Sequence, residues 1–294
     1  MKSDVKWGNK FYDTLSRDLK ELFPNTSGFS VRNLQYMKQF YELFPEALIT
    51  QQVAAQIFEV PWGHLCLIIS ATNRDQQKAF FYVNETIKNN WSRNTLGIFL
   101  DSNLYERQGK AITNFDYHLP KENSDLAKQI TKDPYNFDFL SLKDEFGEKE
   151  LKDALIDNIQ KFLIELGTGF AYMGREYRLS IGESDEFMDM LFYNTSIHAY
   201  VVIEVKTRNF KPEDIGQLGT YVVAVDNMLK SERDEKTVGL LVCKNKNEIL
   251  ARYALESSNQ PIGILSFKLS KLIPENFKSS LPTIEEIENE LKNK

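Results

Sequence analysis

The stretch Ala199-Tyr-Val-Val-Ile-Glu-Val-Lys206 contains the residues that decide the fold of the C-terminal half of this chain. Its β-branched, apolar residues are typical of a strand that is buried on both faces of a sheet. Glu204 and Lys206 lie at the end of this run, and residues two apart in a strand project from the same face. The sequence therefore predicts a buried central strand that carries a carboxylate and an amine side by side.

An acidic residue followed two positions later by lysine is a weak pattern, because it occurs six times in the sequence. The six cases begin at Asp4, Asp18, Glu150, Glu204, Asp234 and Glu290. Only the case at Glu204 ends an apolar strand, whereas the others fit helices, turns or termini, where such pairs are ordinary solvated charges. A second acid, Asp189, lies in the strand predicted at 187–193, so a hairpin of the two strands would bring both carboxylates to one cation. The alternative is an edge-strand ion pair without chemistry.

Two carboxylates beside a lysine are the groups that metal-assisted phosphodiester hydrolysis needs. Together with the backbone carbonyl of Val205, the carboxylates could hold Mg²⁺, a hard cation that keeps several waters and also takes phosphate oxygens; Mn²⁺ is a second candidate. Lys206 could orient or deprotonate the attacking water, or neutralise charge in the transition state. Glu165 is a candidate third ligand and Gln217 a candidate to position the water or the lysine. On pattern alone, both are also typical helix surface residues.

Around this strand, helices and strands alternate over residues 147–272, which predicts an α/β domain. Helices are expected at 148–166, 212–229 and 248–255, and strands at 171–181, 187–193, 199–205, 238–243 and 262–267. The predicted order is therefore α-β-β-β-α-β-α-β. Residues 273–294 are expected to form a charged tail with a surface helix.

Residues 1–132 predict a helical domain, because apolar residues recur at helical spacing and no alternating strand interrupts them. Ser30 and Ser92 are expected N-caps. The helices are expected near 11–22, 31–44, 47–57, 74–90, 92–107 and 123–131. Pro134 and the aromatic–polar alternation after it indicate a linker over 133–146.

Residues Asp18 to Phe44 have the rhythm of helix, short turn and helix found in helix-turn-helix DNA readers. Arg32, Gln35 and Lys38 would then lie on the exposed face of the second helix. An ordinary helical hairpin fits the same pattern.

The composition describes a globular protein of 294 residues with a formal net charge of −6. Proteins that bind nucleic acid mainly through phosphates are usually basic, so any such site must be a local patch. Arg175, Arg178, Arg208 and Lys211 are candidates for a phosphate-binding rim.

Cysteine use and hydropathy point to the cytoplasm. Cys66 and Cys243 lie in apolar runs and are expected to be buried, reduced thiols. The sequence shows neither a membrane-spanning run nor a signal peptide, and its histidines lack zinc-ligand spacing.

Several multi-residue stretches resemble a known family. In the C-terminal half they are Phe162–Arg175, Asp189–Tyr193, Val201–Lys206, Phe210–Gln217, Val238–Asn247 and Pro261–Ile264. In the N-terminal half they are Leu15–Leu19, Gly28–Leu34, Pro61–His64, Asn90–Arg93, Leu104–Lys110, Lys132–Tyr135 and Phe137–Leu140. With these stretches, the chain resembles the YhcG-like nuclease family, a bacterial branch of the PD-(D/E)XK superfamily.

The resemblance implies a helical N-terminal domain followed by a restriction-endonuclease-like α/β domain with a mixed central sheet. It implies a metal-dependent endonuclease acting on DNA, with Asp189, Glu204 and Lys206 as the active-site trio and Gln217 and Glu165 as auxiliary residues. It also suggests that the helical domain lacks a helix before Trp7.

Other readings stay open from the sequence. RNA is an alternative substrate, and a homodimer would suit double-strand cleavage. The competing functions are nucleic-acid binding on a degenerate nuclease fold, without chemistry, and protein assembly through the helical half.

Overall fold

The computed structural model describes residues 10–45, 57–143, 145–270 and 272–273. The chain forms two compact units, a first unit that ends at Glu106 and a second unit that begins at Arg107. Within the described residues, no helix is both long enough and apolar enough to cross a membrane.

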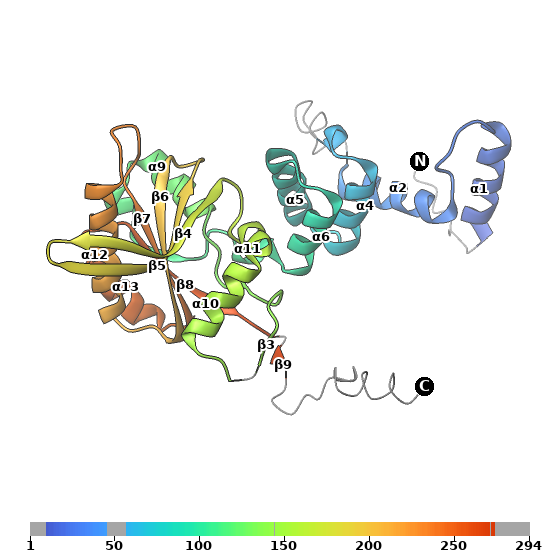
Figure 1. Ribbon diagram of the computed structural model, residues 1–294. Coiled ribbons are helices and arrows are strands. Elements are labelled where there is room, and N and C mark those ends of the chain that lie inside the picture. Colours follow the sequence, from blue (N-terminus) through green and yellow to red (C-terminus); the bar gives the residue numbers. More distant parts are fainter. Residues whose placement is uncertain (1–9, 46–56, 144, 271, 274–294) are drawn as a thin grey trace, which may run out of the picture. The chain divides into compact units, whose positions relative to one another are not determined.

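The first unit is built from helices, as its sequence predicts. They are α1 (Lys10–Leu22), α2 (Val31–Leu43), α4 (Trp62–Ala71), α5 (Gln76–Asn89), α6 (Arg93–Asp101) and the short α7 (Leu104–Arg107) (Figure 1). The predicted N-caps are confirmed, because the hydroxyls of Ser30 and Ser92 accept backbone N–H groups at 3.3 and 3.1 Å. Helix α4 is missing from the prediction because it is apolar on most sides and so lacks a clear helical periodicity.

Helices α1 and α2 do not have the compact turn of a helix-turn-helix. They are joined by residues 23–30, whereas that motif uses a turn of about three to four residues. This connection favours an ordinary helical hairpin over the helix-turn-helix prediction. The helix predicted at 47–57 falls almost entirely outside the described residues.

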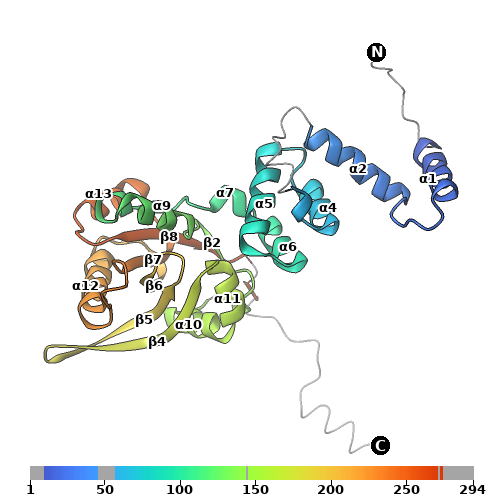
Figure 2. The ribbon, with the colours of Figure 1, turned by 90° about the horizontal axis from the view of Figure 1, so that it is seen from above.

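The second unit contains the mixed central sheet that the family resemblance implies. Its strands are β1 (Ile112–Thr113), β2 (Tyr135–Asn136), β4 (Phe170–Ile181), β5 (Ser184–Asn194), β6 (Ala199–Asn209), β7 (Val238–Asn245) and β8 (Ile262–Lys268). They lie in the order β1-β8-β7-β6-β5-β4, and β2 also pairs with β8 (Figure 2). Strands β4, β5 and β6 are antiparallel, whereas β6, β7 and β8 are parallel. Separately, β3 (Leu142–Lys143) pairs with β9 (Leu272–Ile273).

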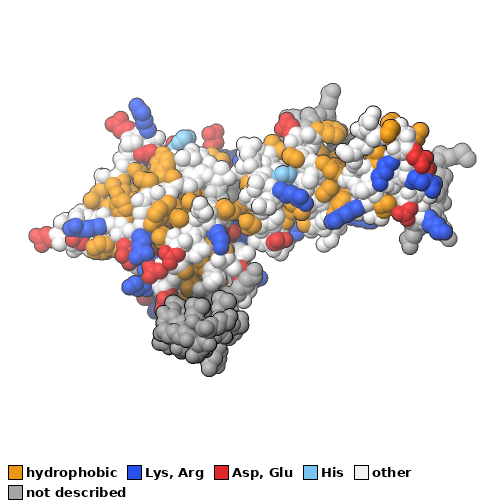
Figure 3. All heavy atoms as spheres, turned by 45° about the vertical axis from the view of Figure 1, so that its right-hand side comes forward, with side chains coloured by type: hydrophobic (Ala, Val, Ile, Leu, Met, Phe, Trp, Pro, Cys, Tyr) orange, Lys and Arg blue, Asp and Glu red, His pale blue; other side chains and the backbone are white. Residues whose placement is uncertain are grey.

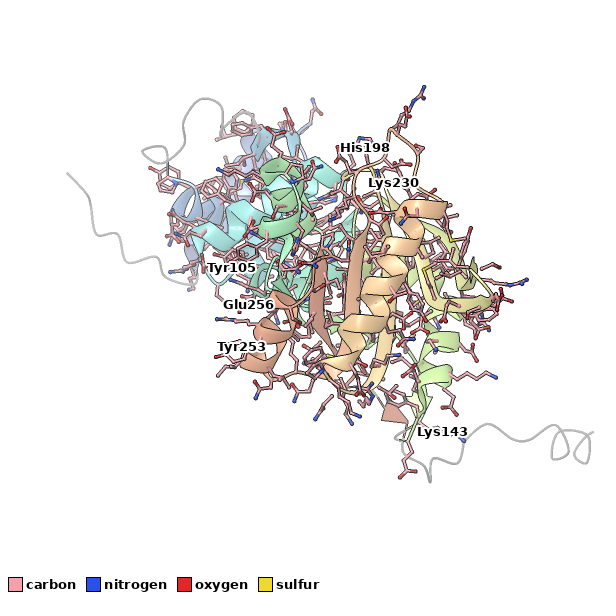
Figure 4. The ribbon with its side chains drawn as sticks, turned by 90° about the vertical axis from the view of Figure 1, so that its left-hand side faces the viewer. Tyr105, Lys143, His198, Lys230, Tyr253 and Glu256 are labelled. Carbon is pink, nitrogen blue, oxygen red and sulfur yellow. The ribbon has the colours of Figure 1, made fainter. Side chains whose placement is uncertain are left out.

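Helices cover both faces of this sheet. One face packs against α10 (Glu148–Asp157) and α11 (Ile159–Leu166), together with α8 (Phe115–His118) and α9 (Lys121–Gln129). The other face packs against α12 (Glu213–Met228) and α13 (Glu248–Glu256). In Figure 4, α12 crosses in front of the strands, and His198 and Lys230 mark the end of the unit where β6 begins and α12 stops.

The central strand β6 is buried on both faces, as its apolar run predicts. Val201, Ile203 and Val205 point into the core beneath α10 and α11, and Val202 points into the core beneath α12. All four side chains are inaccessible to solvent. A buried, parallel-paired strand is a rigid support for the polar residues at its end.

The second unit begins earlier than the sequence predicts, at Arg107 rather than at 147. Phe115 and Ala127, predicted to belong to the helical domain, lie in the core of the sheet. Asn114 joins this segment to the last strand, accepting the N–H of Ile262 at 2.7 Å and donating to the carbonyl of Gln260 at 2.9 Å. These contacts span more than a hundred residues, so no local pattern reveals them.

The segment 133–146 is part of the fold and not the predicted linker. Tyr135 and Phe137 are fully buried, and β2 pairs with β8. Asp133 accepts the backbone N–H of Ser266 at 2.8 Å. The alternation of aromatic and polar residues is the signal of a short strand. The predicted tail lies outside the described residues from 274 onward.

Two further predictions need correction. The helix predicted over 148–166 is interrupted at Asn158, which ends α10 and precedes α11. Cys243 is buried as expected, but Cys66 is only partly buried.

Candidate active site

The predicted site lies where strands β5 and β6 separate. The two strands pair regularly from Asn194 and Ala199 up to Met190 and Ile203, and the pairing stops there. Beyond this point, side chains replace the ladder: Glu204 accepts the backbone N–H of Asp189 at 3.0 Å, and Asp189 accepts the backbone N–H of Val205 at 2.9 Å. The divergence therefore brings the two carboxylates together and holds each by a backbone N–H of the facing strand.

Both carboxylates are buried, with 8% of Asp189 and 2% of Glu204 exposed. Burial disfavours a charged carboxylate and the negative charge of Asp189 adds to this effect, so the pKa of Glu204 rises to about 7. The N–H of Asp189 and the ammonium of Lys206 oppose the rise only in part. The pair is thus an electronegative site that a cation would stabilise.

Lys206 and Lys152 provide positive charge at this site. Lys206 Nζ lies 3.5 Å from Glu204 Oε2 and 3.4 Å from Glu148 Oε1, and Lys152 Nζ lies 2.7 Å from Asp189 Oδ1. Burial lowers the pKa of Lys206, but Glu204, Glu148 and Asp189 outweigh it and the net shift is upward. Lys206 is therefore protonated in this arrangement, which favours donation of hydrogen bonds over proton abstraction.

Glu148 and Lys152 were missed from the sequence, where Glu150-Leu151-Lys152 reads as ordinary helix surface charge. The buried positions Leu151 and Leu155 turn one side of α10 toward the sheet. Glu148 and Lys152, four residues apart, lie 3.6 Å from each other on the side of the helix that meets the end of β6. Helix amphipathicity could have placed them near the sheet, but not at this pair of carboxylates.

Gln217 lies on α12 and is exposed, and its amide donates to the hydroxyl of Tyr221 at 2.9 Å. Tyr221 is buried, which raises its pKa, and the hydrogen bond from Gln217 works against this. The negative charges of Glu204, Glu186 and Asp189 raise the same pKa further. Tyr221 is thus the hydrogen-bond partner that fixes the amide of Gln217 on α12.

Glu165 does not join the carboxylate pair, contrary to its prediction as a third metal ligand. Its carboxylate binds Arg107 through both oxygens, at 2.5 and 3.2 Å, and accepts the backbone N–H of Asn136 at 2.9 Å. Glu165 and Arg107 are buried together. The acid therefore serves a structural ion pair near the start of the second unit.

The predicted phosphate-binding residues are dispersed and mostly ion-paired. Arg175 binds Asp153 at 2.9 Å, and Arg178 binds Asp185 at 2.7 Å in the β4–β5 hairpin, which projects from the sheet (Figures 1 and 2). The remaining partners are Asp214 for Arg208, at 2.6 Å, Glu213 for Lys211, at 3.3 Å, and Glu42 for Lys38, at 3.5 Å. Arg32 and Lys38 belong to the first unit.

Of these cations, Arg175 lines a small hollow together with Lys152 and Asp189. Arg208 donates hydrogen bonds to Asp214, which raises the pKa of Arg208, and the negative charge of Glu148 adds to the rise.

The donor set fits a hard cation that takes few protein ligands. Within the described residues, no three or more His, Cys, Asp or Glu side chains converge on one metal position. Two convergent carboxylates and the neighbouring peptide of Val205 match Mg²⁺, which binds through one or two carboxylates and keeps several waters.

Comparison with known proteins places this architecture in a family. Residues 128–282 match the family described as YhcG PDDEXK nuclease domain, and residues 1–107 match the DUF1016 N-terminal domain. The chain is 28% identical over 298 aligned residues to the Escherichia coli (strain K12) protein named "Putative nuclease YhcG", covering 92% of this chain and 78% of that protein.

Two solved structures share weaker likeness. One is an EndoMS complex with double-stranded DNA, at 23% identity and TM-score 0.30 over 43% of this chain and 45% of that chain. The other is a repair endonuclease from Pyrococcus abyssi, at 21% identity and TM-score 0.29 over 44% and 49%. The matched region thus covers less than half of the length of either solved chain. The family match covers more than half of the chain, including β5, β6 and their carboxylates, and the chain belongs to the YhcG family of PDDEXK nuclease domains.

Proposed function

We propose that this protein hydrolyses phosphodiester bonds in DNA at the Asp189–Glu204–Lys206 site. The observation that carries the proposal is the convergence of two buried carboxylates and a lysine where β5 and β6 separate. A structural ion pair would not need a second buried acid beside Glu204, since the second acid raises the energetic cost of the first. Such costly clusters of titratable groups are typical of functional sites.

Asp189 and Glu204 would hold a divalent cation, for which Mg²⁺ is the first candidate and Mn²⁺ the second. The carbonyl of Val205 would be a further ligand. When bound, such a cation activates water and neutralises charge on the phosphate.

The remaining residues would act on the water and the phosphate directly. Lys206, protonated and half-buried, would donate to the attacking water or to a phosphate oxygen. Lys152, which binds Asp189, would hold that carboxylate in place until the substrate arrives. Gln217 would position water or substrate from the α12 side, with Tyr221 fixing its amide.

Because the protein is acidic overall, DNA would be bound near the site by local positive charge. On the face drawn in Figure 3, the described Lys and Arg side chains of the second unit are intermingled with Asp and Glu. Arg175, which lines a hollow together with Asp189, and Arg208, which follows Lys206 by two residues on β6, are the proposed phosphate contacts. We place the protein in the cytoplasm, where its two free thiols stay reduced.

The test is cleavage of supercoiled, linear and single-stranded DNA, with an RNA substrate alongside. We expect cutting with Mg²⁺, none with EDTA, and at least about a hundredfold slower cutting by Glu204→Gln. Glu183→Gln is the matched control, because Glu183 is exposed in the β4–β5 turn. Cutting that survives in Glu204→Gln would refute the assignment of this site, whereas binding of DNA without any cutting would leave the non-catalytic alternative. A homodimer would show as concentration-dependent cutting of both strands.

A further inference from the structure

The first unit contains a hollow that the proposed chemistry does not use. It has a volume of about 720 Å³, which is within the range of about 300–1,000 Å³ that ligand pockets occupy. Three cations line it from three different helices: Lys20 from α1, Arg32 from α2 and Arg93 from the start of α6. Trp62, Cys66 and Tyr36 form its wall. We call it the basic hollow.

The charges around the basic hollow are unbalanced. None of its described lining residues is an Asp or Glu. Four other cations of the same unit, Arg17, Lys38, Arg74 and Lys78, have acidic partners; Arg17 pairs with Asp18, and Lys78 with Glu106 at 2.6 Å. Within the described part of the chain, Lys20, Arg32 and Arg93 have no such partner. Three cations that line one hollow without an acid create a positive potential there, which attracts anions.

The two arginines and one thiol line the same hollow, although they lie far apart in the sequence. Burial raises the pKa of Cys66, and the positive charges of Arg93 and Arg32 oppose that rise. Cys66 therefore borders the space that the two arginines also border.

The aromatic walls are held in place. The indole N–H of Trp62 donates to the Asn33 side chain at 2.6 Å, and the Tyr36 hydroxyl is 2.9 Å from that of Ser70. Arg32 lies over the Tyr36 ring at 5.7 Å. Positive charge next to fixed aromatic rings is the combination that binds unpaired nucleic-acid strands, since phosphates pair with cations and bases stack on rings.

Three of the stretches that carry the family resemblance meet at this hollow. They are Gly28–Leu34, Pro61–His64 and Asn90–Arg93. His64 ties two of them together, because its Nε2 is 3.1 Å from the carbonyl oxygen of Trp91. Residues from three stretches that carry the family resemblance thus line one hollow, a shared role that the helix-turn-helix hypothesis does not give them.

We propose that the basic hollow binds single-stranded nucleic acid, with phosphates on Arg32, Arg93 and Lys20 and a base against Tyr36 or Trp62. This rests on the proposed function only in taking nucleic acid as the ligand. The hollow would hold an unpaired strand on a unit that carries no part of the proposed cleavage site.

Cys66 makes occupancy of the hollow measurable. The full-length Glu204→Gln protein is treated with a thiol-alkylating reagent in EDTA, with and without a single-stranded oligodeoxynucleotide. Cys243 is fully buried and so does not compete for the reagent in the folded protein. We expect the oligonucleotide to slow alkylation of Cys66 over the same concentrations at which its fluorescence anisotropy rises. No protection of Cys66, or equal protection by inorganic phosphate or by the duplex, would overturn the assignment.

Substitutions test the cations. Arg32→Ala and Arg93→Ala should each weaken oligonucleotide binding about tenfold, and the double variant should lower the salt slope of the binding constant by about 1.4. Arg32→Lys and Arg93→Lys keep the charge and should keep the slope. Arg17→Ala, the matched arginine outside the hollow, should bind like the parent protein. Unchanged binding by the double alanine variant would refute the proposal, provided that circular dichroism shows it folded.

The two proposals fail separately. If the oligonucleotide protects Cys66 but the protein cuts no DNA, the proposal for the basic hollow stands and the nuclease proposal fails. If the protein cuts DNA in a way that depends on Glu204 but Cys66 is not protected, the nuclease proposal stands and the proposal for the hollow fails.

Discussion

Replacing Glu204 by glutamine should make the protein more stable at neutral and basic pH while removing its activity. The carboxylate is buried beside Asp189, so its negative charge destabilises the folded state. Glutamine has the same shape and can keep accepting the N–H of Asp189, but it carries no charge. The substitution thus removes the electrostatic cost without leaving a cavity.

The magnitude follows from the two protonation equilibria. The pKa of Glu204 is about 7 in the folded protein, against 4.5 for the ordinary side chain. A difference of this size corresponds to about 3 kcal/mol of unfolding free energy. The folded state binds the proton more tightly, so wild-type stability falls as pH rises from 4.5 to 7. The gain from Glu204→Gln should therefore be near zero below pH 4.5 and reach its full value above pH 7.

Urea unfolding in EDTA at several pH values between 4.5 and 8 measures this gain. The exposed control Glu183→Gln should stay within about 0.5 kcal/mol of wild type throughout. Adding Mg²⁺ at pH 8 should stabilise the wild type and leave Glu204→Gln nearly unchanged, because only the wild type has both carboxylates. If Glu204→Gln is no more stable than wild type at pH 8, or if its gain does not vary with pH, the burial argument is wrong.

Three further changes have defined outcomes. Lys206→Met should lower the DNA cleavage rate at least about a hundredfold while leaving the fold intact by circular dichroism, because it removes the proposed donor to water or phosphate; a rate close to wild type would exclude that role. Arg107→Met should destabilise the protein by about 3–5 kcal/mol in urea unfolding, because it leaves the buried charge of Glu165 without its partner. Adding Glu165→Gln should recover most of this loss, and no recovery would mean that the ion pair is not its cause. Asn114→Ala should cost about 1–3 kcal/mol by leaving the N–H of Ile262 without its partner, and a loss below about 0.5 kcal/mol would show that water replaces the amide.

Local patterns predicted those parts of the second unit that depend on local periodicity. The run at Val201–Val205 indicated a strand buried on both faces, and the structure has it at the centre of a mixed sheet. The same run led to Glu204 and Lys206, and the hairpin placed Asp189 within hydrogen-bonding reach of Glu204.

What the sequence could not reveal depends on long-range contacts. The start of the second unit at Arg107 depends on an ion pair with Glu165 and on Asn114 binding the chain at Ile262. Lys152 reaches Asp189 because α10 packs over the end of β6. The spacing of charges within α10 could not predict this contact, because the same spacing is found on ordinary solvated helices. The role of Glu165 could not be predicted for the same reason, because its partner Arg107 lies in a distant segment of the sequence.

The pairing of β8 has a consequence for how the protein is made. This strand, at Ile262–Lys268, is the partner of β1, β2 and β7, so three earlier segments remain without their neighbour until it has been synthesised. A nascent chain that already contains Asp189, Glu204 and Lys206 still lacks the strand that joins residues 112–136 to the sheet. A product truncated before Ile262 should therefore be a substrate for cellular proteases and not a free-standing nuclease, which couples cutting activity to completion of translation through the last core strand.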